Sequence, residues 1–344
     1  MQFTLQLMLT RRCPLRCKYC YVKKEDKDMT EDILNKSIYF GLKKTIEINA
    51  NYFHLSLTGG EPFLKPKLIY LSITKLREEL ERRKIIFQPT IATNGTIFNR
   101  KILFLLEKNK ENLLDISIDG YREIHNKNRK YPNGKGSYSI VEKNSKKILK
   151  IIPWARACMV ISKNNFKTIN IKKSFENLFK IGFRHMIFGL EYGNYTDDQV
   201  KYFHELNKKI IEKALEKIIE RNFVAIYPIS KFMLHKEIYD KNKSEKLLSS
   251  NCGAGKNHFT IDTDGSIYPC TFYLEFLKEK SKLGDVFGGL RKSFDEDTCI
   301  FEKKMLNTNL YHRLTEKNLQ WFIKTLKEEK IYNEYINWLK KWVR

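Results

Sequence analysis

The chain has 344 residues, more than an average domain, and 42% of them are hydrophobic, which is enough for a substantial core. No secretory signal begins the sequence and no run reaches membrane-spanning length, so we expect a soluble protein of a reducing cytoplasm without a membrane partner. Lys and Arg total 64 against 40 Asp and Glu, a formal charge of +24. Because these basic residues are spread through helical segments and no base-reading module is present, we expect no nucleic-acid partner.

Short apolar runs alternate with amphipathic segments from the start to about residue 190. The pattern predicts strands at residues 2–9, 52–57, 85–92, 113–118, 157–161 and 185–190. It predicts helices at residues 30–46, 67–83, 100–108, 139–152 and 168–181, with Thr30 as the first N-cap. Such alternation favours a parallel sheet with right-handed crossovers. Since an eightfold barrel needs more units, the predicted fold class is α/β, a partial (β/α)6 TIM-like barrel.

The second part of the chain has a different pattern. A long helix is expected at residues 197–221, followed by a connecting region to about residue 250. Residues 258–268 then form two short alternating runs joined by Asp264-Gly265, which predicts a β-hairpin. A helical tail is expected from Glu316 to Arg344. We therefore expect the barrel at residues 1–230 and a small C-terminal α+β domain at residues 231–344.

Three cysteines follow the first predicted strand with the spacing C-x3-C-x2-C: Cys13, Cys17 and Cys20. Three thiolates so placed can hold three corners of a cubic [4Fe–4S] cluster and leave the fourth iron free to bind a small chelating molecule. A structural zinc site usually has two ligand pairs, and no second CxxC or HxxxH follows. A disulfide framework does not fit an odd cysteine count in a chain without a signal peptide.

Polar and glycine residues follow the next strands, where an α/β barrel places its reactive groups. Gly59 and Gly60, after the second strand, permit another group to approach the backbone closely. The carboxylate of the neighbouring Glu61 can face a cation. The end of the fourth strand offers hydroxyl and carboxylate partners for a ribose. Each turn alone is weak support, but together they predict a site formed by Gly59, Gly60, Glu61, Thr93, Asn94, Ser117 and Asp119.

With these motifs the chain resembles the radical S-adenosylmethionine enzymes over residues 3 to about 290. The cysteine spacing with Tyr19 resembles their cluster loop, and Gly59-Gly60-Glu61 resembles their motif for the methionine amino group. Later motifs resemble the subgroup with a C-terminal SPASM or Twitch domain: Thr93-Asn94-Gly95, Ser117-Ile118-Asp119-Gly120, Arg129, and the segment from Cys252 to Cys270. The resemblance implies that Tyr19, Gly59, Gly60, Glu61, Thr93, Asn94, Ser117, Asp119 and Arg129 bind the cofactor S-adenosylmethionine.

The resemblance also implies an oxidoreductase mechanism. S-adenosylmethionine chelates the open iron, and one electron from the reduced cluster breaks its bond to the 5′-carbon. The resulting 5′-deoxyadenosyl radical removes a hydrogen from the substrate. A flavodoxin or ferredoxin would supply the electron.

The remaining cysteines predict one auxiliary iron–sulfur cluster. Cys252 and Cys270 flank the hairpin, whose ends must lie close together, and Cys299 is a third candidate ligand. The alternative is a degenerate domain that keeps the scaffold without metal. Cys158 lies inside an apolar strand, where we expect a buried, inert thiol.

Members of the subgroup mostly modify peptides or proteins, so a ribosomally made peptide that gains a crosslink, a thioether or an epimerised residue is the leading substrate class. Sulfatase maturation is an alternative, although those enzymes carry Asp after the equivalent of Cys270, where this chain has Thr271. Small-molecule radical chemistry and a catalytically silent iron–sulfur scaffold are the others. Because the chain begins with the barrel, we expect a separate partner or the basic surface to bind any leader peptide.

Overall fold

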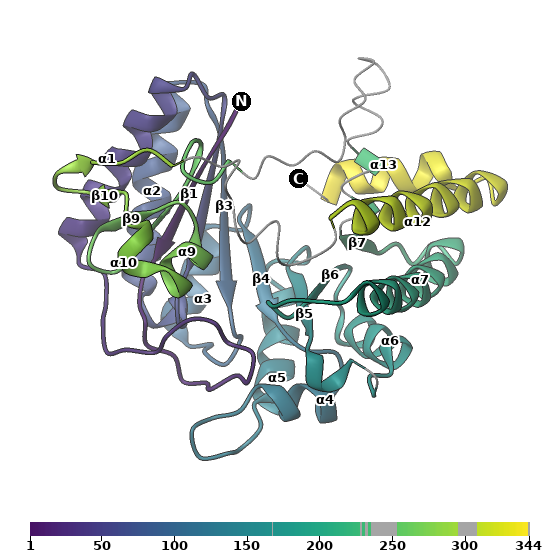
Figure 1. Cartoon of the computed structure of the whole chain (residues 1–344). Helices are drawn as coiled ribbons and strands as arrows, with labels where there is room; N and C mark the ends of the chain where they lie inside the picture. Colours follow the sequence, from purple (N-terminus) through teal and green to yellow (C-terminus); the bar gives the residue numbers. More distant parts are fainter. Residues whose placement is uncertain (167, 228, 231–232, 235–252, 295–307, 343–344) are drawn as a thin grey trace. The chain divides into compact units, whose positions relative to one another are not determined.

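The structure is a computed structural model that describes residues 1–166, 168–227, 229, 230, 233, 234, 253–294 and 308–342 (Figure 1). The chain divides into two compact units. Unit 1 comprises Met1–Ile116, Lys130–Lys135 and Asn251–Cys299, and unit 2 comprises Ser117–Arg129, Gly136–Ser250 and Ile300–Arg344. The domain boundary expected at residue 230 stays a prediction. Every described helix is too short or too polar to cross a lipid bilayer.

Unit 1 is a mainly parallel sheet that continues into antiparallel strands. Its strand order is β11-β10-β9-β8-β1-β2-β3-β4, parallel from β8 to β4 and antiparallel from β8 to β11. The elements are β1 (Gln2–Met8), α1 (Glu31–Glu47), β2 (Tyr52–Thr58), η1 (Pro62–Leu64), α2 (Pro66–Arg82), β3 (Ile86–Thr93), α3 (Arg100–Lys108), β4 (Leu113–Ser117, its last residue in unit 2), β8 (His258–Ile261), β9 (Ser266–Tyr268), α9 (Thr271–Phe276), α10 (Lys278–Ser281), β10 (Gly284–Asp285) and β11 (Gly289–Leu290).

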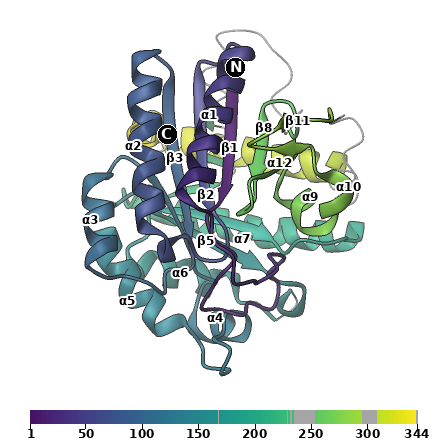
Figure 2. The same ribbon diagram turned by 90° about the vertical axis from the view of Figure 1, so that its left-hand side faces the viewer.

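The first strand of the chain pairs with a strand from its last third. β1 pairs in parallel with β2 on one side and with β8 on the other, with Leu5 opposite both Leu55 and Phe259. Figure 2 shows β8 beside β1. Phe3, Leu5 and Leu7 alternate along β1 and are fully buried, so the period-two pattern read from the sequence places one face of this strand in the core.

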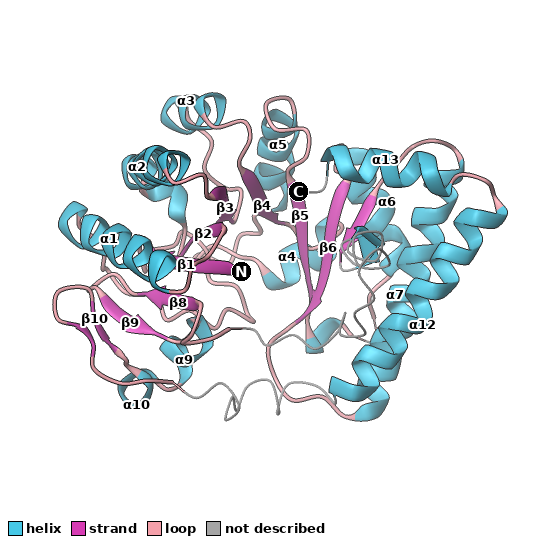
Figure 3. Cartoon of the chain, turned by 90° about the horizontal axis from the view of Figure 1, so that it is seen from above, coloured by secondary structure: helices cyan, strands magenta, loops and turns pink. Residues whose placement is uncertain are grey.

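Unit 2 contains three parallel strands in the order β5-β6-β7 and the remaining helices. Helices α7 and α12 lie side by side (Figure 3), with Lys208 Nζ 5.9 Å from the centre of the Trp321 ring. The elements are α4 (Arg122–Asn128), α5 (Tyr138–Leu149), β5 (Arg156–Ile161), η2 (Lys163–Asn165), α6 (Ile171–Ile181), β6 (His185–Leu190), α7 (Asp197–Ile219), β7 (Ala225–Tyr227), α12 (Thr308–Glu328) and α13 (Tyr332–Trp342).

The α/β fold class with a parallel sheet is confirmed. All six predicted strands, the five helices predicted between them and the long helix predicted at residues 197–221 exist, with ends within three residues of those expected. Thr30 caps α1 as predicted, since its side chain accepts a hydrogen bond from Ile33 N at 3.2 Å. The hairpin turn is also confirmed, with Gly265 at φ +85°. The helical tail is two helices, because Lys330 adopts a left-handed conformation (φ 55°) between α12 and α13.

The expectation of a buried Cys158 is wrong. Side chains alternate along β5, and Ala157, Met159 and Ile161 occupy its buried face. Cys158 therefore points to the other face and is only half-buried.

A buried guanidinium joins the start of the cysteine loop to the C-terminal part of unit 1. Arg11 Nε and Nη2 each donate to a carboxylate oxygen of Asp262 at 2.9 Å, and Nη1 donates to Glu275 Oε1 at 3.0 Å. All three side chains are at most 2% exposed. Glu275 Oε2 also accepts a hydrogen bond from Lys23 N at 2.9 Å. Burial alone would raise the pKa of Asp262, but the hydrogen bond from Arg11 holds this pKa below its ordinary value.

Replacing this guanidinium should destabilise unit 1 strongly. In Arg11→Met, Glu275 would stay buried without its cation and Asp262 would keep only the partly exposed Lys278, 3.3 Å away. We expect a loss of about 3–5 kcal/mol in the free energy of unfolding, measured with urea. The neighbouring Arg12 is the matched control, because its half-exposed side chain pairs with Asp26 and Asp28 at the surface. Arg12→Met should cost about 1 kcal/mol or less. Equal losses in the two variants would contradict the central role of Arg11.

Candidate active site

The three cysteines of the N-terminal motif lie on one irregular loop, residues 10–21, which follows β1 and is called here the cysteine loop. Cys13 and Cys17 are half-buried and Cys20 is exposed. Within the described ranges, no three His, Cys, Asp or Glu side chains come close enough together to hold a single metal ion. A cubic cluster does not require that, because each of its irons takes its own thiolate.

Hydrogen-bond donors point at the sulfurs of Cys13 and Cys20. Asn94 Nδ2 lies 3.4 Å from Cys13 Sγ, and Lys24 Nζ lies 3.0 Å from Cys20 Sγ. Burial raises the pKa of the Cys13 thiol, while the donors and the Lys24 charge act in the opposite direction. Donors favour a charged sulfur over a neutral thiol. The loop therefore fits an iron–sulfur cluster in both the number of its thiols and their surroundings.

The two glycines after β2 bring its end into contact with the cysteine loop. Gly60 N donates to Thr10 O at 2.7 Å, and Glu61 N donates to Arg12 O at 2.9 Å. A Cβ atom on Gly59, which has φ +135°, would lie 2.3 Å from Thr10 O, and one on Gly60 would lie 2.1 Å from Arg12 O. The close approach predicted from the glycines thus serves backbone packing between β2 and the cysteine loop.

Glu61 joins the ends of β2 and β3. Its fully buried carboxylate accepts hydrogen bonds from Phe63 N at 3.0 Å, Thr93 Oγ1 at 2.6 Å and Asn94 N at 2.7 Å. Burial raises the pKa of Glu61 to about 7 in spite of these donors. Because Asn94 in turn contacts Cys13, a continuous chain of contacts runs from Glu61 to the first cysteine. The role expected for Glu61 opposite a cation stays a prediction.

The other predicted residues of unit 1 are placed only in part. Tyr19 is half-buried on the cysteine loop. Cys270 is half-buried at the N-terminus of α9, after the hairpin. Cys252 and Cys299 lie outside the described residues, so the proximity expected for these three cysteines stays a prediction.

In unit 2 the predicted polar residues form a buried ion pair. Arg129 Nε and Nη2 each lie 3.1 Å from a carboxylate oxygen of Asp119, which is fully buried. Asp119 also accepts a hydrogen bond from Val160 N and donates its own N–H to His125 Nδ1 at 3.2 Å. Burial lowers the pKa of His125 to about 3, so this imidazole is neutral at physiological pH. Ser117 is half-buried at the end of β4.

Two contacts of this region carry no local sequence signal. Nothing in the sequence distinguishes Lys24 from the many other lysines, because its contact with Cys20 depends on the path of the loop. The Arg11 network joins residues that are more than 250 positions apart, so only the folded chain brings them together.

Comparison with known proteins identifies a domain in the first half of the chain. The profile of the Radical SAM superfamily matches residues 7–170, which include the cysteine loop, Gly59–Glu61 and the Asp119–Arg129 pair. The chain contains a radical SAM domain. It is an enzyme of this superfamily, and its cofactors are a [4Fe–4S] cluster and S-adenosylmethionine.

The relatives of this radical SAM enzyme match it over most of its length. It is 26% identical over 326 residues to the cysteine-type anaerobic sulfatase-maturating enzyme of Clostridium novyi (strain NT), covering 90% of this chain and 83% of the relative. It is 24% identical to the antilisterial bacteriocin subtilosin biosynthesis protein AlbA of Bacillus subtilis (strain 168), covering 89% and 68%. The solved structure of native anSMEcpe with bound AdoMet has the same fold, with a TM-score of 0.68, 20% identity, and 98% and 99% of the two chains covered.

The raised pKa of Glu61 predicts a pH-dependent stability of the cofactor-free protein. Since the pKa lies near 7 in the folded state and near 4.5 ordinarily, the neutral carboxyl stabilises the fold below about pH 4.5, and this contribution is lost as the pH rises through 7. Relative to Glu61→Gln, the unfolding free energy of wild type should therefore fall by on the order of 3 kcal/mol as the pH rises from about 4.5 to 7. Urea unfolding at several pH values measures the difference. The unfolding free energy of Glu123→Gln, at an exposed position, should change with pH as that of wild type does. If Glu61→Gln showed this same pH dependence, the prediction would be contradicted.

Proposed function

We propose that this radical SAM enzyme is a peptide maturase, which removes a hydrogen atom from a ribosomally synthesised peptide and so directs a crosslink, a thioether or an epimerisation. The observation that carries the radical chemistry is the cysteine loop, with donors on the sulfurs of Cys13 and Cys20 and its backbone packed on Gly59 and Gly60. When bound there, the cluster and S-adenosylmethionine supply a 5′-deoxyadenosyl radical.

The residues of unit 1 have distinct proposed roles. Cys13, Cys17 and Cys20 each hold one iron. Asn94 orients Cys13 through its amide, and the buried Glu61 fixes Asn94 through its backbone N–H. Glu61 therefore acts as a positioning residue, whether or not its carboxylate also meets the methionine ammonium. Tyr19, Gly59, Gly60 and Thr93 complete the residues that we assign to the cofactor.

In unit 2, Ser117, Asp119 and Arg129 are assigned to S-adenosylmethionine as well. The carboxylate of Asp119 is already held by Arg129 and Val160 N. We therefore give Asp119 the role of fixing the backbone at the end of β4, and Ser117 the direct polar contact.

The peptide substrate class is supported by the relatives. Their names describe sulfatase maturation and subtilosin biosynthesis, and solved structures of the same fold include anSMEcpe with a bound peptide and SuiB of Streptococcus suis with its precursor peptide SuiA. For the electron donor we propose an acidic flavodoxin or ferredoxin, because a chain with a formal charge of +24 attracts acidic proteins.

Sulfatase maturation is the second candidate, and the similarity to sulfatase-maturating enzymes over 90% of the chain favours it. The residue after Cys270 weighs against it. Thr271 is buried and hydrogen-bonded to Gln6 Oε1, and a threonine hydroxyl at this position does not provide the carboxylate base that those enzymes carry. We therefore keep the peptide maturase as the main proposal.

An auxiliary iron–sulfur cluster on Cys252, Cys270 and Cys299 is also proposed. The half-buried thiol of Cys270, directly after the β8–β9 hairpin, supports it. If the cluster is cubic, Cys252→Ala/Cys270→Ala should contain about four fewer irons per chain than wild type after anaerobic reconstitution. Cys158→Ala, at a half-exposed cysteine outside both motifs, should keep the wild-type iron content. Equal iron in the double variant and wild type would favour the degenerate domain.

Reductive cleavage of S-adenosylmethionine tests the proposed chemistry directly. Reconstituted protein with dithionite should release 5′-deoxyadenosine, and Cys17→Ala should reduce this release to background because one iron loses its ligand. Cys158→Ala is again the matched control and should keep the activity. Wild-type release no higher than that of Cys17→Ala would favour the silent scaffold.

A peptide assay separates the two candidate substrates. We expect the enzyme to leave the cysteine of a sulfatase-derived peptide unchanged, with mass spectrometry as the readout. Catalytic oxidation of that cysteine over several turnovers would favour the sulfatase-maturase function and overturn the main proposal.

A further inference from the structure

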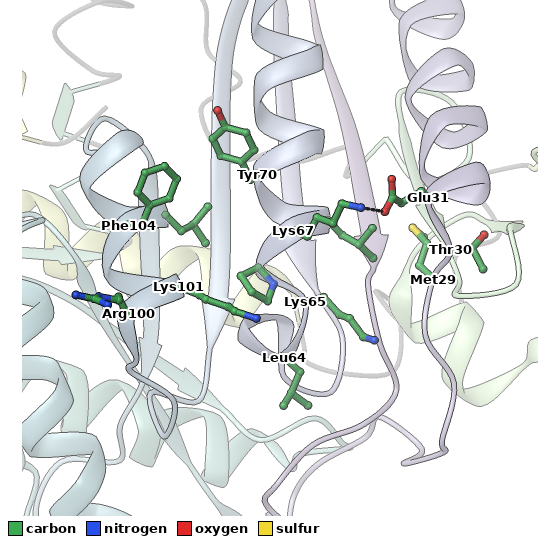
Figure 4. Close-up of a pocket in the computed structure, with 13 residues that line it drawn as sticks. Met29, Thr30, Glu31, Leu64, Lys65, Lys67, Tyr70, Arg100, Lys101 and Phe104 are labelled. Carbon is green, nitrogen blue, oxygen red and sulfur yellow. Dashed lines mark ion pairs between the residues drawn. The ribbon is translucent and has the colours of Figure 1, made fainter.

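A groove of about 970 Å³ opens in unit 1 between the first turns of α1, α2 and α3 (Figure 4). It is within the size range of ligand-binding pockets. Its lining comes from Met29, Thr30, Glu31, Leu64, Lys65, Pro66, Lys67, Leu68, Tyr70, Arg100, Lys101, Phe104 and Leu105. None of these residues belongs to the cysteine loop or to the residues assigned to the cofactor, so the groove is a separate feature of unit 1.

One end of the groove is aromatic and apolar. Tyr70 and Phe104 are 40% and 54% exposed, and their ring centres lie 6.4 Å apart. Leu64, also 40% exposed, continues the apolar lining. Large apolar side chains gathered in one exposed hollow usually mark a binding site, because covering them removes apolar surface from water.

The other end of the groove is cationic. Figure 4 shows Lys65 and Lys101 at the end away from Tyr70 and Phe104. The charge there is not balanced within the groove: Lys67 pairs with Glu31 and Lys65 pairs with Asp28, but Arg100 and Lys101 form no ion pair with any residue that the structure describes. The first turns of α2 and α3 add the positive ends of two helix dipoles to this charge.

The two ends are about one helical turn apart. Tyr70 follows Pro66 by four positions on α2, and Phe104 follows Arg100 by four positions on α3, and residues four apart lie on the same face of a helix. The backbone positions of the two ends are thus roughly 5 Å apart along the helix axes. A ligand that satisfies both ends must therefore carry a bulky apolar group and an anionic group close to one another. Neighbouring side chains of an amphipathic acidic peptide meet this requirement.

We propose that this groove binds an acidic, hydrophobic segment of the peptide substrate, with an apolar side chain against Tyr70 and Phe104 and Asp or Glu carboxylates on Arg100 and Lys101. The inference rests on the proposed peptide-maturase function, and it adds a docking site outside the radical chemistry. Charge complementarity and the concave apolar lining favour a peptide over an acidic redox protein, whose attraction to this chain needs positive charge but no apolar hollow.

The test measures binding of a fluorescein-labelled twelve-residue peptide of Glu, Leu and Trp to full-length reconstituted protein by fluorescence anisotropy. Arg100→Ser/Lys101→Ser and Tyr70→Ser/Phe104→Ser should each raise the dissociation constant at least about tenfold. The control Lys110→Ser/Lys209→Ser removes the same charge as the first variant, but at exposed sites elsewhere. It should change the dissociation constant less than about twofold. Circular dichroism and the melting temperature verify that each variant is folded.

Probe composition provides the second arm. A peptide with Lys in place of Glu, and one with Ser in place of Leu and Trp, should each bind at least about tenfold more weakly than the Glu-Leu-Trp peptide. Equal affinity of the groove variants and the control variant would overturn the proposal. So would loss of flavodoxin binding in the groove variants with peptide binding retained, since that result assigns the groove to the electron donor. Release of 5′-deoxyadenosine by wild type tests the proposed function separately, so the two failures are distinguishable.

Discussion

The buried guanidinium of Arg11 is the contact on which the cysteine loop depends. Arg11 lies two positions before Cys13 and binds Asp262 and Glu275. Glu275 also accepts a hydrogen bond from the backbone of Lys23, just beyond Cys20. Both ends of the loop are thus fixed by carboxylates from the C-terminal part of unit 1. Together with the backbone hydrogen bonds that Gly60 and Glu61 donate to Thr10 and Arg12, these anchors hold a loop that has no regular secondary structure.

The candidate active site is built by connecting strand ends to one another. Gly59 and Gly60 let the end of β2 meet the backbone of the cysteine loop, and Glu61 links that end to Thr93 and Asn94 after β3. Burial of this carboxylate raises its pKa to about 7 in spite of its three hydrogen-bond donors. The protein thereby accepts a destabilising charge at neutral pH in exchange for a defined geometry between two strands, as functional sites commonly do.

The sequence predicted what local patterns can encode. The alternation in β1 and the cap at Thr30 depend on residues close together in the chain, and the structure confirms them. The short strands β10 and β11, two residues each, are too brief to show alternation. The Arg11 network and the groove beside Tyr70 and Phe104 join distant residues, which a single sequence does not reveal. The prediction of a buried Cys158 failed for a related reason, because the sequence of an apolar strand does not show which of its two faces is buried.

The parallel pairing of β1 with β8 has a consequence for the biosynthesis of the protein. The cysteine loop leaves the ribosome early, whereas β8, Asp262 and Glu275 are made some 250 residues later. During that interval the loop has neither its neighbouring strand nor its carboxylate anchors, and long-range pairing of this kind forms late. The thiols of the cysteine loop are therefore synthesised well before the strand and the two carboxylates that hold the loop in the folded protein.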